Sequence, residues 1–166
     1  MNLDLASIQR RVAGQAFWER YLSAASADEA PIGMHVAVFA EPFLTHVLNG
    51  AKTTESRFSR VRCAPFEEVS DGDVILIKKV AGPICGIALA HKTWCYDLTY
   101  EPLERIRDRH GEAICADEAF WDAQRDANYA TLIELSHQAA LDAVPFEKRD
   151  RRGWVSLRSR QLGMAF

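Results

Sequence analysis

Apolar residues recur along the chain with two different periods, and the change of period separates predicted helices from predicted strands. Residues 3–23 place apolar side chains at helical spacing, which predicts an amphipathic helix. The stretch 23–31 that follows is small and polar and contains a proline, so it is typical of a linker. We therefore divide the chain into an N-terminal helix with its linker, residues 1–31, and a main domain, residues 32–166.

Short apolar runs in the main domain predict strands. Most of these runs are bounded by proline, glycine or Asp-Gly, the residues that interrupt regular structure. The predicted strands cover residues 34–40, 53–58, 73–80, 84–96, 129–135 and 154–157. Their number and spacing predict a meandering, partly closed and mainly antiparallel barrel, and the helices between them make the fold class α+β.

Three segments of the main domain return to helical spacing. Pro42 opens a short helix that is expected to end at Gly50, because glycine accepts a left-handed backbone. Thr99 and Asp117 are expected to cap two further helices, and Gly111 is expected to end the first of them. Helices inserted between barrel strands usually wall a cleft or plug an open end.

The strongest chemical signal lies where the short helix meets the second strand. The stretch 50–57 reads Gly-Ala-Lys-Thr-Thr-Glu-Ser-Arg. Because side chains alternate along a strand, Glu55 and Arg57 share one face, and Lys52 in the turn can lean toward them. One interpretation is a solvated surface ion pair worth under about 1 kcal/mol. In the other, the two cations hold phosphate or base oxygens and Glu55 accepts from a base amino group.

Charge and its distribution narrow the choice of ligand. The 166 residues carry a net charge of −3, which argues against a protein that coats duplex DNA through overall positive charge. Local basic clusters still allow nucleic-acid recognition. Trp154 either stacks on an unpaired base or closes the core. The further candidate contacts with a nucleic acid or nucleotide are Arg60, Arg62, Lys79, Arg151 and Trp154.

The sequence predicts neither a metal site nor a nucleotide cofactor. His91 and Cys95 have the spacing of one metal-binding pair, but no second pair completes it, and the cysteines include no C-x-x-C motif. The chain has no glycine-rich phosphate-binding motif. No apolar run approaches the ~20 residues that span a bilayer, and the N-terminus does not read as a signal peptide, so we expect a cytoplasmic protein without membrane contact.

Taken as an ordered set, these features resemble the ASCH domain family, a branch of the PUA-like barrels. The resemblance covers roughly residues 34–157. Its parts are the first strand, Glu41-Pro42-Phe43 and the helix there, the G-x-K-x-x-E-x-R pattern at Gly50, Lys52, Glu55 and Arg57, the Asp71-Gly72-Asp73 turn, and Gly153-Trp154-Val155.

The resemblance implies a PUA-like barrel whose signature residues face a cleft beside the first helix of the barrel. It implies an RNA-related function, with single-stranded RNA or a modified nucleoside or nucleotide as the partner. Some small members of the family are hydrolases, either ribonucleases or amidohydrolases that act on N4-acetylcytidine. The enzyme alternative for this chain is therefore a ribonuclease or, with less support, an amidohydrolase.

The residues at the signature bear directly on that alternative. In the amidohydrolase type the signature lysine is catalytic and a threonine three residues later is the nucleophile. Lys52 is present here, but Glu55 stands at the position of the threonine. A carboxylate cannot simply replace a hydroxyl nucleophile whose acyl-enzyme must turn over. A catalytic version would use Glu55 as general base and Lys52 to stabilise negative charge. A third interpretation is a protein-interaction domain that forms a homodimer through the N-terminal helix.

Overall fold

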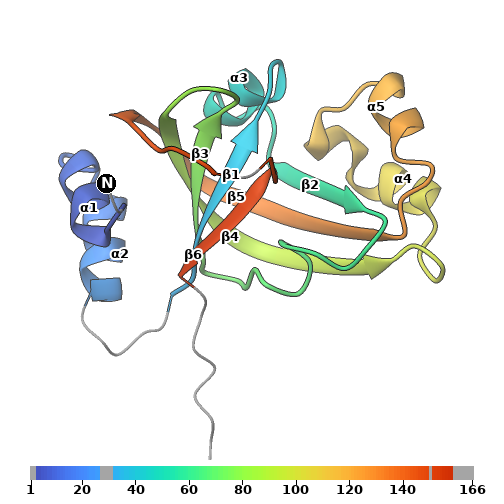
Figure 1. Ribbon diagram of the computed structural model, residues 1–166, viewed down its shortest axis with the longest axis horizontal. Helices are drawn as coiled ribbons and strands as arrows, with labels where there is room; N and C mark the ends of the chain where they lie inside the picture. Colours follow the sequence, from blue (N-terminus) through green and yellow to red (C-terminus); the bar gives the residue numbers. More distant parts are fainter. Residues whose placement is uncertain (1–2, 27–31, 150, 159–166) are drawn as a thin grey trace, which may run out of the picture.

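Six strands form one mixed sheet that curls into a half-barrel, with helices at both ends of the molecule (Figure 1). The computed structural model describes residues 3–26, 32–149 and 151–158. The order in the sheet is β2-β5-β4-β3-β1-β6. The strands are β1 (Met34–Phe39), β2 (Thr54–Ser59), β3 (Val74–Lys79), β4 (Ile84–Asp97), β5 (Tyr129–Val144) and β6 (Trp154–Arg158).

The predicted α+β class and the partly closed, mainly antiparallel barrel are confirmed, but the strands do not form a simple meander. Only β3, β4 and β5 are both consecutive in sequence and neighbours in the sheet. β1 pairs in parallel with β3 and antiparallel with β6. This order leaves β2 and β6 at the two ends of the sheet, each with one unpaired edge. Periodicity identifies strands, but it does not encode which distant segments pair.

The alternation of side chains along β1 divides the core into two sides. Val36 is fully buried in a cluster with the N-terminal helices, whereas Ala37 is fully buried in a cluster with α3 (Phe43–Leu48). This is the alternation expected for a strand that is covered on both faces. A third cluster lies beneath α4 (Leu103–Ile114) and α5 (Glu118–Ala123), at the other end of the molecule (Figure 1).

The N-terminal segment forms two helices and not the single helix expected over residues 3–23. α1 (Leu5–Arg11) and α2 (Ala16–Ser26) are separated by a turn at Gly14, whose φ is +87°. Ile8 and Val12 are fully buried against the chain's own sheet. The apolar face that we considered for a homodimer is thus packed within the chain. Residues 27–31 of the expected linker lie outside the described residues.

The helices of the main domain begin and end close to the expected residues, except for α4. α3 ends at Leu48 with Asn49 as its C-cap, and Gly50 follows with a φ of +81°. Asp117 caps α5 as expected, because its Oδ1 accepts a hydrogen bond of 2.8 Å from the backbone N–H of Phe120. In α4, Gly111 was expected to end the helix but lies inside it.

α4 ends three residues after Gly111 because of packing. Ile114 is fully buried in the cluster beneath α4, so the helix continues past Gly111 until the side chain of Ile114 is covered. Cys115 then ends the helix in the left-handed conformation, with a φ of 58°. The start also differs, because Pro102 and not Thr99 occupies the N-cap position. No helix in the described part of the chain is long and apolar enough to cross a membrane.

Candidate functional site

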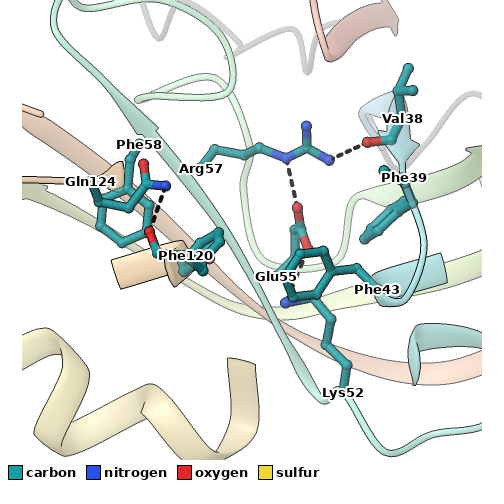
Figure 2. Close-up of a pocket in the computed structure, with 11 residues that line it drawn as sticks. Val38, Phe39, Phe43, Lys52, Glu55, Arg57, Phe58, Phe120 and Gln124 are labelled. Carbon is teal, nitrogen blue, oxygen red and sulfur yellow. Dashed lines mark hydrogen bonds and ion pairs between the residues drawn. The ribbon is translucent and has the colours of Figure 1, made fainter. Parts of the chain in front are cut away.

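A pocket of about 230 Å³ lies at the open seam of the half-barrel, along β2 (Figure 2). Val38 and Phe39 at the end of β1 line one side of it, and Phe58, Phe120 and Gln124 line the other. Three charged residues of the signature stretch lie between these walls: Lys52, Glu55 and Arg57. The structure therefore brings together the three residues that the sequence singled out first.

Glu55 is the centre of this charged group. Its Oε1 accepts a hydrogen bond of 2.6 Å from Nε of Arg57, and its Oε2 lies 3.4 Å from Nζ of Lys52. The side chains of Lys52 and Glu55 are only 3% and 6% exposed, and that of Arg57 is 22% exposed. The interpretation as a solvated surface ion pair is therefore wrong. Because the group is buried, the loss of either partner costs far more free energy than it would at a surface.

Lys52 is held in place by the turn after α3 and by the end of α4. Its backbone N–H donates to the carbonyl of His46 at 2.9 Å, and its Nζ donates to the carbonyl of Ile114 at 2.8 Å. That carbonyl lies at the C-terminus of α4, where unsatisfied carbonyls and the helix dipole favour a cation. The ring of Phe43 lies 5.2 Å from Nζ, which adds a cation–π contact.

Arg57 bridges the seam between the two ends of the sheet. One terminal nitrogen of its guanidinium donates to the carbonyl of Val38 at 2.8 Å, and the other donates to the carbonyl of Gly153 at 3.2 Å. The rings of Phe39 and Trp154 lie 5.4 and 5.7 Å from its central carbon. Arg57 thus ties the free edge of β2 to β1 and to the residue that precedes β6.

The absence of a side chain at Gly153 makes room for this bridge. A Cβ atom at that position would lie 2.7 Å from Nη1 of Arg57, closer than two such atoms can approach. The sequence analysis noted Gly153 only as part of the C-terminal pattern. The structure explains why a glycine is needed at this position: the guanidinium of Arg57 passes beside it.

The charged group keeps unused capacity to bind a ligand. Among the described residues, two of the three N–H donors of Lys52 and three of the five N–H donors of Arg57 have protein acceptors. One donor of Lys52 and two donors of Arg57 have no acceptor there. The Oγ of Ser56, which also lines the pocket, is buried and has no hydrogen-bond partner in the described part of the chain. A buried polar atom without a partner costs free energy, so this hydroxyl contributes nothing to the stability of the fold.

The backbone of β2 adds a donor and an acceptor at the same place. The carbonyl of Thr53 accepts from the N–H of Leu135 in β5, so it faces the paired edge of β2. Backbone groups of successive residues point to opposite edges, and the N–H and C=O of Ser56 therefore face the unpaired edge. The pocket lies at this edge, so Ser56 presents its backbone there.

The aromatic wall comes from segments far apart in sequence. The rings of Phe43 and Phe120 meet edge to face, with 5.6 Å between their centroids, and Phe58 lies 6.0 Å from Phe120. Nε2 of Gln124 donates to the carbonyl of Phe120 at 3.1 Å, which fixes the amide beside the ring. The sequence analysis missed Phe120 and Gln124. The only local signal was the cap at Asp117, which placed α5 but not its neighbours.

The other candidate contacts lie outside this pocket. Arg60 is exposed and paired with Asp126 at 3.2 Å, and Arg62 lies over the rings of Phe66 and Tyr129. Lys79 is exposed at the end of β3, and Arg151 lines a separate groove.

Trp154 is only 3% exposed and lies in the core. Its Nε1 donates to Nδ1 of His35 at 3.3 Å, and its ring supports Arg57 from behind. It does not line the pocket, so it presents no face on which a base could stack. Within the described residues, no group of three His, Cys, Asp or Glu side chains is placed to hold a metal ion.

Comparison with solved structures identifies the fold. The crystal structure of ASCH from Zymomonas mobilis matches with a TM-score of 0.60 and 15% identity, over 75% of this chain and 87% of that protein. A serine-to-alanine variant of the same protein matches with a TM-score of 0.62 and 15% identity, over 78% and 91%. No family model and no curated protein matches the sequence. The chain therefore has the fold of these ASCH structures.

Proposed function

We propose that the seam pocket binds a base of RNA or of a modified nucleoside through Lys52, Glu55 and Arg57. The observation that carries the proposal is the convergence of these buried charges, with unused donors and acceptors, beneath aromatic walls. A nucleobase has an apolar face and an edge that carries both donors and acceptors, and this combination matches the pocket. The fold supports the proposal, because nucleic-acid-related function is expected of PUA-like domains.

The mixed charge favours a base over an isolated phosphate. A phosphate presents acceptors alone and is best bound by cations and N–H groups. Glu55 would repel such an anion, whereas it attracts an amino group such as that of cytosine. The size agrees, since about 230 Å³ corresponds to roughly eight waters at about 30 Å³ each, the scale of a single-ring base.

The same geometry favours recognition over catalysis. Both oxygens of Glu55 contact cations, and each keeps a second lone pair that can accept from a base amino group. Ser56 could supply a hydroxyl nucleophile, yet its Oγ is buried and has no base within hydrogen-bond reach among the described residues. The described residues of the pocket thus offer an acceptor for a base edge but no prepared hydroxyl nucleophile.

The direct test is calorimetric titration with cytidine, N4-acetylcytidine, uridine, adenosine and guanosine. We expect binding to one or more pyrimidine nucleosides, and a loss of tenfold or more in Lys52→Met or Glu55→Gln, since a charged hydrogen bond contributes about 1.5–3 kcal/mol. Lys92→Met, the same change at an exposed lysine, is the matched control and should bind as the wild type does.

Two results would overturn the proposal. One is the absence of binding to every nucleoside and to single-stranded RNA at low salt. The other is affinity that is unchanged in both pocket variants. Product analysis of the same mixtures tests the alternative, because turnover that is lost in Glu55→Gln while binding remains would make the protein an enzyme.

A further inference from the structure

A second concavity, the basic groove, begins where the seam pocket ends. It has a volume of about 880 Å³ and lies between the β3–β4 turn and the segment that precedes β6. Val38 lines both the pocket and the groove. Gly153 lines the groove, and its carbonyl accepts from Arg57 on the pocket side. The two concavities therefore have Val38 in common, and the hydrogen bond between Arg57 and Gly153 links them.

Positive charge is concentrated along the basic groove although the chain as a whole is negative. The sequence from 147 to 152 holds four basic and two acidic residues, against a net charge of −3 for the whole protein. Lys148, Arg151 and Arg152 line the groove, and Arg151 and Arg152 are exposed. The backbone carbonyl of Arg152 accepts a hydrogen bond from Nζ of Lys148.

The opposite wall of the groove contributes a buried cation and apolar surface. Nζ of Lys78 donates to the carbonyls of Gly82 at 2.6 Å and Lys79 at 3.1 Å, so its charge is fixed beneath the β3–β4 turn. Val80 on this turn is 50% exposed, and Pro83 lies beside it in the lining. Cations alternate here with apolar surface, the combination that accommodates phosphates together with sugars and bases.

We propose that the basic groove holds the phosphodiester backbone of a single-stranded nucleic acid whose base occupies the seam pocket. The inference rests on the proposed function and names its substrate class: a nucleotide within a strand and not a free nucleoside. Arginine presents a planar fork that matches phosphate oxygens, and Arg151 and Arg152 line the groove where a strand leaving the pocket would pass. A duplex cannot place a base in the pocket unless that base first leaves its pair.

The test compares a nucleoside with a single-stranded oligonucleotide of about eight nucleotides, a length within the usual site size of such proteins. The groove variant is Arg151→Gln with Arg152→Gln. The matched control is Arg105→Gln with Arg109→Gln on α4, which removes the same charge from exposed residues at the far end of the molecule (Figure 1). Circular-dichroism melts check that both variants fold.

We expect the wild type to bind the oligonucleotide at least tenfold more tightly than the nucleoside. The groove variant should lose about tenfold for the oligonucleotide alone. The slope of log affinity against log salt concentration should become less steep by about 1.4, because each phosphate contact on a single strand contributes about 0.7. The control variant should match the wild type for both ligands.

Three results would overturn the inference. The oligonucleotide binds no more tightly than the nucleoside, the groove variant behaves as the control does, or an acidic peptide of equal charge binds as tightly as the oligonucleotide. An oligonucleotide with no bases separates this inference from the proposed function. Suppose that this base-free oligonucleotide binds, that the groove variant binds it more weakly, and that no nucleoside binds. Phosphate binding in the groove is then supported, and base binding in the seam pocket is refuted.

Discussion

Replacing Arg57 by alanine is expected to destabilise the fold, and not only to weaken ligand binding. The guanidinium makes one hydrogen bond to Glu55 and one each to the carbonyls of Val38 and Gly153. A hydrogen bond to a charged group contributes about 1.5–3 kcal/mol, but solvent screening reduces this because the side chain is 22% exposed. Lys52 still balances part of the charge of Glu55, so we expect a total loss of about 3 kcal/mol.

The measurement is urea unfolding followed by circular dichroism and tryptophan fluorescence. A loss of about 3 kcal/mol should lower the melting temperature by roughly 6–12 °C for a chain of this size. Arg57→Lys should recover less than half of the loss, since one ammonium group cannot reach all three acceptors. Arg60→Ala is the control, because Arg60 forms an exposed ion pair and its loss should cost under about 0.5 kcal/mol.

A double-mutant cycle separates two contributions of Arg57 to stability, its ion pair with Glu55 and its hydrogen bonds to the carbonyls across the seam. Arg57→Ala and Glu55→Gln should couple by about 1 kcal/mol or more, because each change leaves the other partner buried and unbalanced. The remaining cost of Arg57→Ala then belongs to the two carbonyls across the seam. The reasoning is refuted if Arg57→Ala costs no more than Arg60→Ala, since the seam would then hold without its bridge.

Three further predictions follow from individual contacts. Ser56→Ala should leave the free energy of unfolding unchanged or slightly raised in urea unfolding, because the hydroxyl is buried without a partner among the described residues. A clear loss of stability would contradict this. Gly153→Ala should displace Arg57 and lower stability by about 1 kcal/mol in urea unfolding, and an unchanged midpoint would contradict the close approach. Burial raises the pKa of Asp73, but hydrogen bonds from His35 and from two backbone amides outweigh it and lower the pKa below its usual 3.8. This stabilisation is complete above the unfolded pKa and is lost as pH falls through the lower folded value, so Asp73→Asn should cost about 3 kcal/mol at pH 7. The difference in the free energy of unfolding between Asp73→Asn and the wild type should shrink as pH falls from about 5 to 2. A difference that does not change with pH would contradict this prediction.

The sequence located the charged group because the relevant pattern is local. Glu55 and Arg57 are two residues apart on a strand, so alternation alone places them on one face, and the 2.6 Å hydrogen bond confirms this. Lys52 follows a helix stop, which placed it in the turn before that strand. The strands and α3 were predictable for the same reason, since each depends on spacing within a few residues.

Burial of the group was not predictable, because it depends on partners distant in sequence. The carbonyls of Ile114, Val38 and Gly153 hold Lys52 and Arg57, and backbone carbonyls leave no mark in a sequence. The parallel pairing of β1 with β3 is equally invisible, although it decides that β2 and β6 end the sheet. Without that order, nothing indicates an open seam for Arg57 to cross.

Packing also overrode local signals at both ends of the molecule (Figure 1). Gly14 was passed over in a helical pattern, but it takes a positive φ and lets α1 and α2 each cover the sheet. Gly111 was read as a helix stop, but burial of Ile114 outweighs the roughly 1 kcal/mol that glycine costs inside a helix. One glycine that interrupts a helix was missed, and another that lies inside a helix was taken as its end. Tertiary contacts decide which glycine ends a helix.

The seam links stability to binding through shared residues. Arg57 both joins the two ends of the sheet and faces the pocket, so a ligand that contacts it also reinforces the joint. A ligand present at a hundred times its dissociation constant stabilises a protein by about 2.7 kcal/mol, whatever contacts it makes. In the seam pocket this gain should be accompanied by slower hydrogen exchange at the backbone amides beside the seam, such as the N–H of Val38, which donates to Gly153 at 2.9 Å. In the function that we propose, Glu55 accepts from an amino group of that ligand, and because Glu55 also holds Arg57 at 2.6 Å, binding at the base edge would act on the same residue that joins the seam.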